Sequence, residues 1–438
     1  MSRQRFTSVL PLFLLILISA FAGPGPIAKA SQNNPWNVAQ GRDRPGPPEL
    51  NVKESLYASV GAVLTQYELD VKEAMLTPRS SVTLPRGVQY AWPSPDHRVL
   101  YVAWSAGTND RPLGEQGISS FHIDKKTGAL AEFGTPIMLL KRPVHIATDN
   151  AGRYLLAAHN NPPAGVTVWT INGDGSLGVE VPQPGVTDGG IYAHQILVDP
   201  FDRMAILTTR GNVPAEAPSG VEEPGAMKVF AYDNGVLSNE SSVAPNHGFG
   251  FQPRHVAFAK TLVYLAVERQ NQLQVYERLG DDTLAPLPMF IKNTLADPVN
   301  NNESIFPAQM VGPIQMSHDG RFVYIGNRNN GTIGTPPVFR GGENNVAVFS
   351  IDKATGEPTL IQNADTHGFV PRTITFDKTG KILVAANQTA RNVLNTDGSI
   401  TSVPTSLAVF RINSDGTLQY ARKYDNTGGT WAGFLSAP

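Results

Sequence analysis

Two oppositely charged residues, Arg254 and Glu268, mark the open end of one predicted β-hairpin. Its first strand is expected to start just after Arg254 and its second to end at Glu268, with the turn at residues 259–261. Both strands are apolar and rich in β-branched and aromatic residues. Because the start of one strand lies beside the end of the next in a hairpin, we expect the guanidinium and the carboxylate to be neighbours.

Other polar side chains occupy the same kind of position, at the start of one strand or the end of the next. Each has an ordinary structural explanation, since arginines at strand ends often cap carbonyl groups and single histidines are mostly structural. Convergence of several on one concave surface would instead favour an anionic ligand, which arginines bind well. These residues are His145, His194, His255, Arg269, Asn327, Arg328, Arg372, Asn387 and Gln388.

The sequence contains no familiar motif of metal, nucleotide or serine-nucleophile chemistry. HExxH, the Walker A sequence and GxSxG are missing, and the nine histidines lack the spacing of metal ligands. The chain has no cysteine, which excludes disulfides and thiolate metal sites. We therefore expect no cofactor and no metal. Any catalysis would use a positioned water molecule, a general acid or base and cationic stabilisation of an oxyanion.

An internal repeat predicts the elements that position these residues. Each unit has a strand, a polar turn, a second strand ending in small residues, and a third strand with alternating apolar residues. A turn ending in Gly-x-Leu often leads to a fourth strand. The middle residues of the second strands, at positions 101, 156, 206, 264, 324 and 384, are 50 to 60 residues apart. Four strands per unit describe a propeller blade, and six units are complete.

Two remaining segments complete a seventh blade. Residues 62–69 match the third strand of a unit, and residues 430–435 match the first strand. Sharing one blade between the two ends closes the ring and removes exposed sheet edges. The predicted fold is therefore all-β, a single seven-bladed β-propeller of four-stranded antiparallel blades over residues 55–438.

Five long connections are expected on one face of this ring. Four join second to third strands and one leads into a first strand, and in an up-and-down blade these connections emerge on the same side. Long loops on a rigid scaffold commonly carry binding residues, and the polar residues above point to this face. The connections span residues 109–116, 211–225, 297–309, 329–344 and 389–405.

The N-terminus has the pattern of a secretory signal peptide. Two arginines precede an apolar run over residues 9–22, and Ala28-Lys29-Ala30 provides a cleavage site. The run is shorter than the ~20 residues that a membrane span needs, although an uncleaved anchor is the alternative. We expect a signal peptide over residues 1–30, a loose leader over 31–54, and a mature periplasmic or secreted protein that is not held in a membrane.

The composition agrees with an all-β protein. The 41 glycines and 35 prolines suit many short strands joined by turns. The 35 basic and 37 acidic side chains nearly balance, so the chain lacks the electrostatic footprint of a nucleic-acid-binding protein. We therefore expect a small-molecule partner and no nucleic acid.

Several of these segments, in the same order, resemble the seven-bladed lactonase family. That family contains bacterial 6-phosphogluconolactonase and the fungal 3-carboxy-cis,cis-muconate lactonizing enzyme. The resemblance spans about residues 56–438, with weaker matches at residues 143–145 and 193–194. Its most specific parts are Gln252-Pro253-Arg254-His255 with Val267-Glu268, Asn327-Arg328, Pro371-Arg372, and Asn387-Gln388.

The resemblance implies a catalytic site of His194, Arg254, Glu268 and Arg328. Glu268, together with His194, would activate water or carry the proton, while the two arginines hold the substrate carboxylate and stabilise the oxyanion. Two stretches near the site, residues 313–315 and 209–212, depart from the family pattern. The expected substrate-binding residues are His145, His255, Arg372, Asn387 and Gln388.

Three functions are compatible with the sequence. The leading hypothesis is an exported lactonase-like hydrolase that opens a small anionic sugar- or carboxy-lactone by attack of water. The second is a cycloisomerase of the carboxymuconate type, which needs the same arginines and one proton donor but consumes no water. The third is a non-catalytic propeller that binds a small organic acid, because a fold does not fix a function.

Overall fold

The computed structural model describes residues 53–106, 115–302, 306, 308–426 and 430–436. The predicted signal peptide, and the predicted leader up to residue 52, lie outside this part of the chain. The described residues form thirty-two β-strands and two four-residue helical segments, so the all-β prediction is confirmed. No helix within these ranges is long and apolar enough to cross a membrane.

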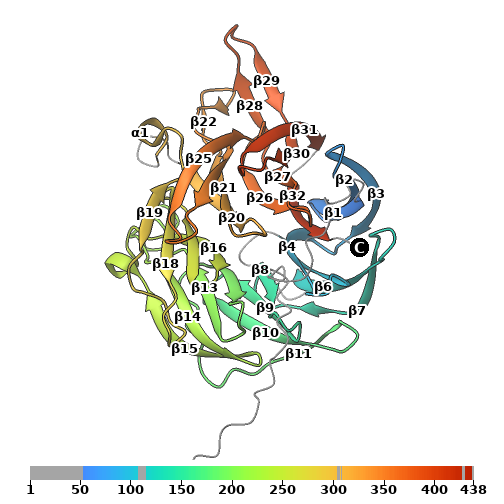
Figure 1. Cartoon of the computed structure of the whole chain (residues 1–438), viewed down its shortest axis with the longest axis vertical. Coiled ribbons are helices and arrows are strands. Elements are labelled where there is room, and N and C mark those ends of the chain that lie inside the picture. Colours follow the sequence, from blue (N-terminus) through green and yellow to red (C-terminus); the bar gives the residue numbers. More distant parts are fainter. Residues whose placement is uncertain (1–52, 107–114, 303–305, 307, 427–429, 437–438) are drawn as a thin grey trace, which may run out of the picture. The chain divides into compact units, whose positions relative to one another are not determined.

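Seven four-stranded antiparallel sheets form the blades of a β-propeller (Figure 1). Six are continuous in sequence and are numbered blades 1 to 6 here. Blade 1 contains β4 (Gly87–Pro93), β5 (Val99–Ser105), β6 (Gln116–Ile123) and β7 (Leu130–Met138). Blade 2 contains β8 (Pro143–Thr148), β9 (Tyr154–His159), β10 (Gly165–Ile171) and β11 (Leu177–Glu180). Blade 3 contains β12 (Ala193–Val198), β13 (Met204–Thr209), β14 (Ala226–Asp233) and β15 (Val236–Val243).

The next three blades follow the same plan. Blade 4 contains β16 (Pro253–Ala259), β17 (Leu262–Val267), β18 (Gln272–Glu277) and β19 (Phe290–Asn293); blade 5 contains β20 (Gln309–Met316), β21 (Phe322–Asn329), β24 (Asn345–Ile351) and β25 (Pro358–Asp365); blade 6 contains β26 (Pro371–Phe376), β27 (Ile382–Asn387), β30 (Thr405–Ile412) and β31 (Leu418–Asn426).

The closing blade joins the two ends of the chain, as predicted. Its strands, in sheet order, are β32 (Thr430–Ser436), β1 (Lys53–Val60), β2 (Val63–Asp70) and β3 (Met75–Thr83). In β1, Tyr57 is opposite Phe434 on one side and Gln66 on the other. The first strands of successive blades contact one another in a closed circle, from β4 through β8, β12, β16, β20 and β26 to β32 and back to β4. These first strands therefore surround the central channel.

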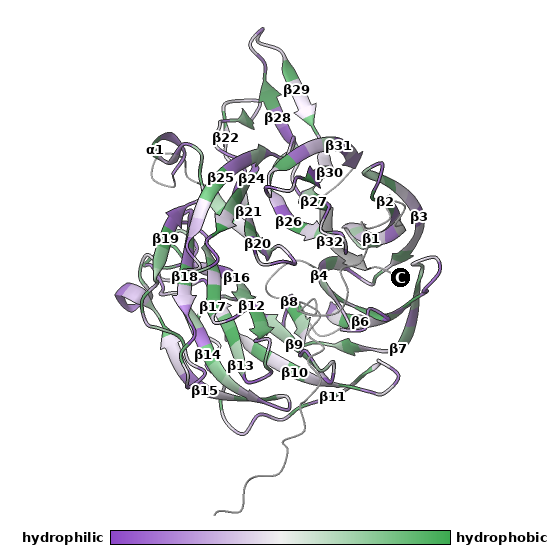
Figure 2. Cartoon of the chain, in the orientation of Figure 1, coloured by the Kyte–Doolittle hydropathy of each residue, from purple (hydrophilic) through white to green (hydrophobic). Residues whose placement is uncertain are grey.

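The apolar core lies between neighbouring blades. Each of seven buried clusters in the described residues combines side chains from two adjacent sheets. Between blades 3 and 4, for example, Ile206 and Val229 pack with Val256 and Leu265. Figure 2 shows this pattern as hydrophobic strands connected by largely hydrophilic turns.

Tyrosine hydroxyls tie several blades to their neighbours and explain part of the glycine repeat. Tyr101 Oη donates to the carbonyl of Gly175 at 2.8 Å, and Tyr264 Oη donates to that of Gly356 at 2.8 Å. Both glycines have positive φ, +89° and +76°, in the turn before the fourth strand. A glycine is favoured there because other residues rarely adopt this conformation.

Some connections contain further structure. Between second and third strands, blade 5 carries a hairpin of β22 (Thr332–Ile333) and β23 (Val338–Phe339), and blade 6 carries one of β28 (Arg391–Leu394) and β29 (Ile400–Val403). Strands β23 and β28 contact each other. The 3₁₀ segment η1 (Pro245–Gly248) precedes β16, and α1 (Pro298–Asn301) precedes β20.

Candidate active site

A bulge interrupts the first strand of each complete blade. In blades 3, 4 and 6, the register with the second strand shifts across one residue, which is His194, Arg254 or Arg372, respectively. A bulge leaves its extra residue outside the ladder and re-aims that side chain. The predicted polar residues at these strand starts therefore owe their direction to a local irregularity of the sheet.

One residue at or near the end of each second strand occupies an equivalent position beside the bulge of the first strand. The residue before it pairs with the last first-strand residue before the bulge, as Thr209 does with Ala193 and Asn327 with Val311. Equivalent positions in blades 2 to 6 are therefore Asn160, Arg210, Glu268, Arg328 and Gln388.

Glu268 is the centre of a buried ion cluster and is only 3% exposed. Its Oε2 lies 2.8 Å from Arg254 Nε and 3.3 Å from Arg328 Nη2. Its Oε1 accepts a hydrogen bond from Arg210 Nη1 at 3.2 Å. The structure thus places Arg254 beside Glu268, as the hairpin argument predicted, and adds arginines from the blades on both sides.

The electrostatics of this cluster decide what Glu268 can do. Burial favours the neutral acid, but the charges of Arg328, Arg210 and Arg254 outweigh burial and lower the pKa of Glu268 to about 2. At neutral pH this carboxylate is ionised, and both of its oxygens are engaged by guanidinium groups. Glu268 therefore holds the arginines in place and remains ionised.

Three histidines from successive first strands meet beside the arginines. The ring centroid of His255 is 5.0 Å from that of His194 and 6.0 Å from that of His145. Both ring nitrogens of His145 and the Nδ1 of His194 are buried without a hydrogen-bond partner among the described residues. Among the described residues, no group of three or more histidine, cysteine, aspartate or glutamate side chains is placed to hold a metal ion.

These histidines are held in the neutral form. Burial and the positive charge of Arg254 lower the pKa of His145 to about 3 and shift the pKa values of His194 and His255 well below the usual range. A neutral imidazole with an unpartnered nitrogen can accept a proton or a hydrogen bond. The site therefore combines fixed cations with neutral basic groups.

Comparison with known proteins identifies the family. The family described as "Lactonase, 7-bladed beta-propeller" matches residues 55–397. The chain belongs to this lactonase family. A 6-phosphogluconolactonase of Bacillus subtilis is 26% identical over 356 residues, which cover 78% of this chain and 90% of the relative. Another from Formosa agariphila is 31% identical over 280 residues, covering 63% and 72% of the two chains.

Solved structures show the same fold. The periplasmic gluconolactonase PpgL of Pseudomonas aeruginosa superposes with a TM-score of 0.65 at 18% sequence identity. The match covers 88% of this chain and 100% of PpgL. The predicted resemblance and the predicted fold are thus confirmed. The enzyme class is also confirmed, since the curated relatives are named as lactone-hydrolysing enzymes.

Arg210 belongs to the Glu268 cluster but was not among the predicted site residues. Its Nη2 lies 2.7 Å from Glu216 Oε2, and its guanidinium lies 4.0 Å from the centroid of the Tyr192 ring. Arg210 thereby links Glu268 to Glu216, which lies in the loop after β13. The sequence could have indicated Arg210 by its position, because it directly follows a second strand, as Glu268 does.

The predicted substrate-binding residues fall into two groups. His145, His255 and Arg372 lie with the cluster; burial lowers the pKa of Arg372, and the nearby Tyr192 and Glu268 oppose that shift. Asn387 instead donates its amide to Ser406 Oγ of blade 6 at 3.1 Å and to Thr366 O, in the connection before β26, at 2.9 Å. Gln388 donates its backbone N–H to Val370 O at 2.9 Å.

Proposed function

We propose that this protein hydrolyses a small anionic lactone at the Glu268 cluster. The observation that supports this most strongly is the excess of cations around one carboxylate. Arg210, Arg254 and Arg328 are paired with Glu268, whereas the side chain of the half-buried Arg372 has no hydrogen bond or ion pair among the described residues. A bound carboxylate or phosphate would supply the missing negative charge, and arginine is well suited to both.

The proposed base is His194. A water oxygen attacks the lactone carbonyl carbon while the imidazole accepts the water proton, and the positive charges of Arg254 and Arg328 stabilise the oxyanion. The ring C–O bond then breaks, and the imidazolium returns the proton to the departing alkoxide, which gives a hydroxy acid. One charged donor of this kind typically contributes about 3 kcal/mol of transition-state stabilisation. In this proposal Glu268 orients the arginines, and His194 carries out the proton transfer that was expected from the sequence for Glu268 together with His194.

The substrate itself is expected to activate this base. In the free protein, burial and the neighbouring arginines keep the pKa of His194 low. A bound anion offsets the arginine charges and thereby raises the pKa of the imidazole. Proton transfer would then become most favourable when an anionic substrate is in place.

We also propose export to the periplasm or the medium. The support is the signal-peptide pattern of residues 1–30. The similar fold of a protein described as a periplasmic gluconolactonase agrees with such a location. The curated relatives named 6-phosphogluconolactonase favour a sugar lactone as the substrate class.

A panel assay distinguishes this proposal from its alternatives. Purified protein is tested in a pH-stat with 6-phosphogluconolactone, gluconolactone and a carboxymuconolactone, and separately with carboxymuconate. Acid release from a lactone, with incorporation of labelled water oxygen, supports hydrolysis. Isomer formation without such incorporation would identify a cycloisomerase, and thermal stabilisation by gluconate or citrate without any turnover would identify a binding protein.

A further inference from the structure

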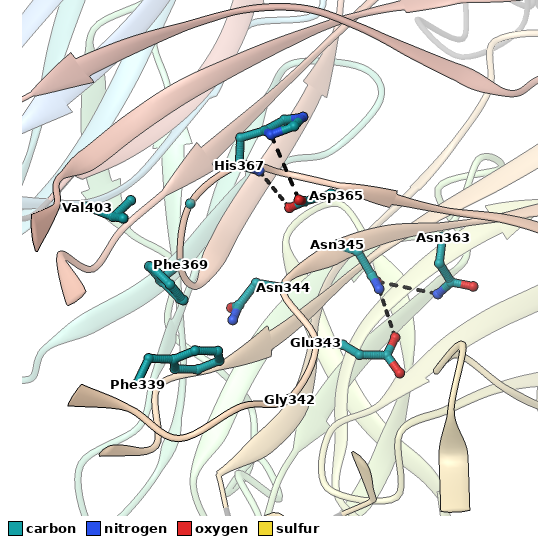
Figure 3. Close-up of a pocket in the computed structure, with 11 residues that line it drawn as sticks. Phe339, Gly342, Glu343, Asn344, Asn345, Asn363, Asp365, His367, Phe369 and Val403 are labelled. Carbon is teal, nitrogen blue, oxygen red and sulfur yellow. Dashed lines mark hydrogen bonds and ion pairs between the residues drawn. The ribbon is translucent and has the colours of Figure 1, made fainter. Parts of the chain in front are cut away.

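A groove of about 410 Å³ lies on blades 5 and 6, and none of its lining residues belongs to the Glu268 cluster (Figure 3). Its walls include the ends of both insertion hairpins, Phe339 of β23 and Val403 of β29, and the loop over residues 367–369. We propose that this groove is a second binding site, which takes a neutral saccharide.

Two aromatic rings form an apolar wall of the groove. The ring centroids of Phe339 and Phe369 are 4.6 Å apart, and their planes are tilted by 58°. Phe339 is half-buried, so part of its ring faces the groove. Aromatic surfaces of this kind match the C–H face of a sugar ring and bury apolar area on contact.

Asn344 supplies a hydrogen-bond donor without an acceptor. Its Oδ1 accepts bonds from the backbone nitrogens of Asn329 and Val370, at 2.9 and 2.8 Å, which fixes the orientation of the amide. Its Nδ2 is buried and has no partner among the described residues. Figure 3 shows this amide directed toward the two phenylalanine rings. Leaving such a donor unpaired costs about 1–3 kcal/mol, which a ligand oxygen would recover.

The charges of the groove restrict the class of ligand. No lysine or arginine lines it, so an anion would find no counter-charge. Glu343 is already occupied, since it accepts bonds from the backbone nitrogens of Ala296 and Asp297, both at 2.9 Å. Asp365 Oδ1 accepts from the backbone nitrogen of His367 at 2.8 Å, but the side chain is 73% exposed, so Oδ2 is available to accept from a hydroxyl. An ammonium ion offers no acceptor for Asn344, whereas a sugar hydroxyl serves both residues.

The loop beside the groove has a strained backbone. Val370 has φ of +61° and His367 has φ of +53°, although neither is glycine. A β-branched residue at positive φ is a genuine outlier, and such strain concentrates at ligand sites. Asn344 holds Val370 by its backbone N–H, and Gln388 holds it by its carbonyl. The loop is therefore fixed in a preformed shape next to the groove.

Calorimetric titration tests this proposal with maltotetraose, cellotetraose and xylotetraose, beside choline and gluconate as cationic and anionic probes. We expect at least one tetrasaccharide to bind. Asn344→Asp keeps the acceptor for both backbone nitrogens but removes the donor, and Phe339→Ala removes part of the aromatic wall. Each should weaken binding by about tenfold.

Controls separate this site from the lactonase site and from loss of folding. Phe201→Ala removes a phenylalanine that is 50% exposed and outside the groove, and it should leave saccharide binding unchanged. Turnover of any lactone substrate should be unaffected by Asn344→Asp and Phe339→Ala. The proposal is wrong if no tetrasaccharide binds, if choline or gluconate binds in the groove instead, or if both groove variants bind like the wild type.

Discussion

At the scale of single residues, the roles of Glu268 and His194 differ because their surroundings differ. Glu268 is surrounded by guanidinium groups that stabilise its charge, whereas His194 is buried near cations that oppose its protonation. The sequence could place Arg254 beside Glu268 through the hairpin. The family resemblance added Arg328, but the sequence did not reveal that Arg210, from the preceding blade, also shares this carboxylate.

This difference predicts a larger loss of stability for replacement of Glu268 than for replacement of His194. Glu268→Gln leaves buried arginines without their counter-charge, so it should lower the free energy of unfolding by about 3–5 kcal/mol and also reduce turnover. His194→Asn removes a base that makes no ion pair, so it should reduce kcat by at least about tenfold with a smaller loss of stability. Urea denaturation and steady-state kinetics measure both effects. Wild-type stability of Glu268→Gln, or wild-type kcat of His194→Asn, would contradict this assignment.

The pH dependence of the reaction follows from the same groups. Since the pKa values of His145, His194 and His255 are lowered, these rings stay neutral as the pH falls below 6.5. We therefore expect kcat/KM to be nearly constant between pH 8 and pH 6 and to decline only at lower pH. A kcat/KM profile from pH 4 to 8 measures this, and a decline centred at or above pH 6.5 would disagree with the assigned base.

At the scale of elements, the bulges of the first strands position the site. Thr208 of β13 connects two of them: its Oγ1 donates to the carbonyl of Arg254 at 2.6 Å and accepts from the backbone nitrogen of Gln195, next to His194, at 3.1 Å. Alternating apolar residues predicted these strands but carried no information about a one-residue shift. Such a shift is set by contacts between blades.

Replacing this hydroxyl tests whether the bulges matter for catalysis. Thr208→Val preserves shape but leaves the Arg254 carbonyl and the Gln195 nitrogen without their bonds, so we expect kcat to fall by about tenfold or more through misplacement of His194 and Arg254. Thr209→Val is the matched control, because the Thr209 hydroxyl donates to Ala226 O at 3.0 Å outside the bulges. Equal kcat values for the two variants would show that the bulges need no support from Thr208.

At the scale of the whole molecule, one buried acid lies where the ring closes. Glu54 of β1 is 2% exposed, and its Oε2 accepts from the backbone nitrogen of Lys378, between the strands of blade 6, at 2.8 Å. Its Oε1 is buried without a partner among the described residues. Burial raises the pKa of Glu54 to about 7, although the Lys378 bond opposes this, and the Asp377 charge raises it further.

This raised pKa makes the stability of the closed propeller depend on pH. The folded state favours the protonated acid, so its contribution is fully present below about pH 4.5 and is lost as the pH rises through about 7. Glu54→Gln should remove this dependence and stabilise the protein at pH 8 by up to about 3 kcal/mol. Urea denaturation at pH 5 and pH 8 measures the effect, with the exposed Glu132→Gln as control. A stability difference that is the same in wild type and Glu54→Gln would refute this role.

The architecture itself was predictable because a repeated unit leaves many independent signals. Six second strands, their polar turns and the two end segments indicated the same seven blades, and the structure agrees. The site was less predictable, because equivalent positions hold different residues. Asn160, Arg210, Glu268, Arg328 and Gln388 share a position beside the bulge of the first strand but no common chemistry, so no repeat pattern could identify them as a set.

Recognition of an anionic lactone is the central claim, and a matched substrate pair tests it most directly. The measurement is kcat/KM for 6-phosphogluconolactone and for gluconolactone, which differ by one phosphate, in wild type and in Arg372→Gln. Arg372 is half-buried and outside the ion pairs of Glu268, so its replacement should not disturb the cluster. The account predicts at least about a tenfold preference of the wild type for the phosphorylated lactone, mostly lost in Arg372→Gln through a higher KM. Equal turnover of the two lactones by the wild type, or an unchanged preference in Arg372→Gln, would contradict it.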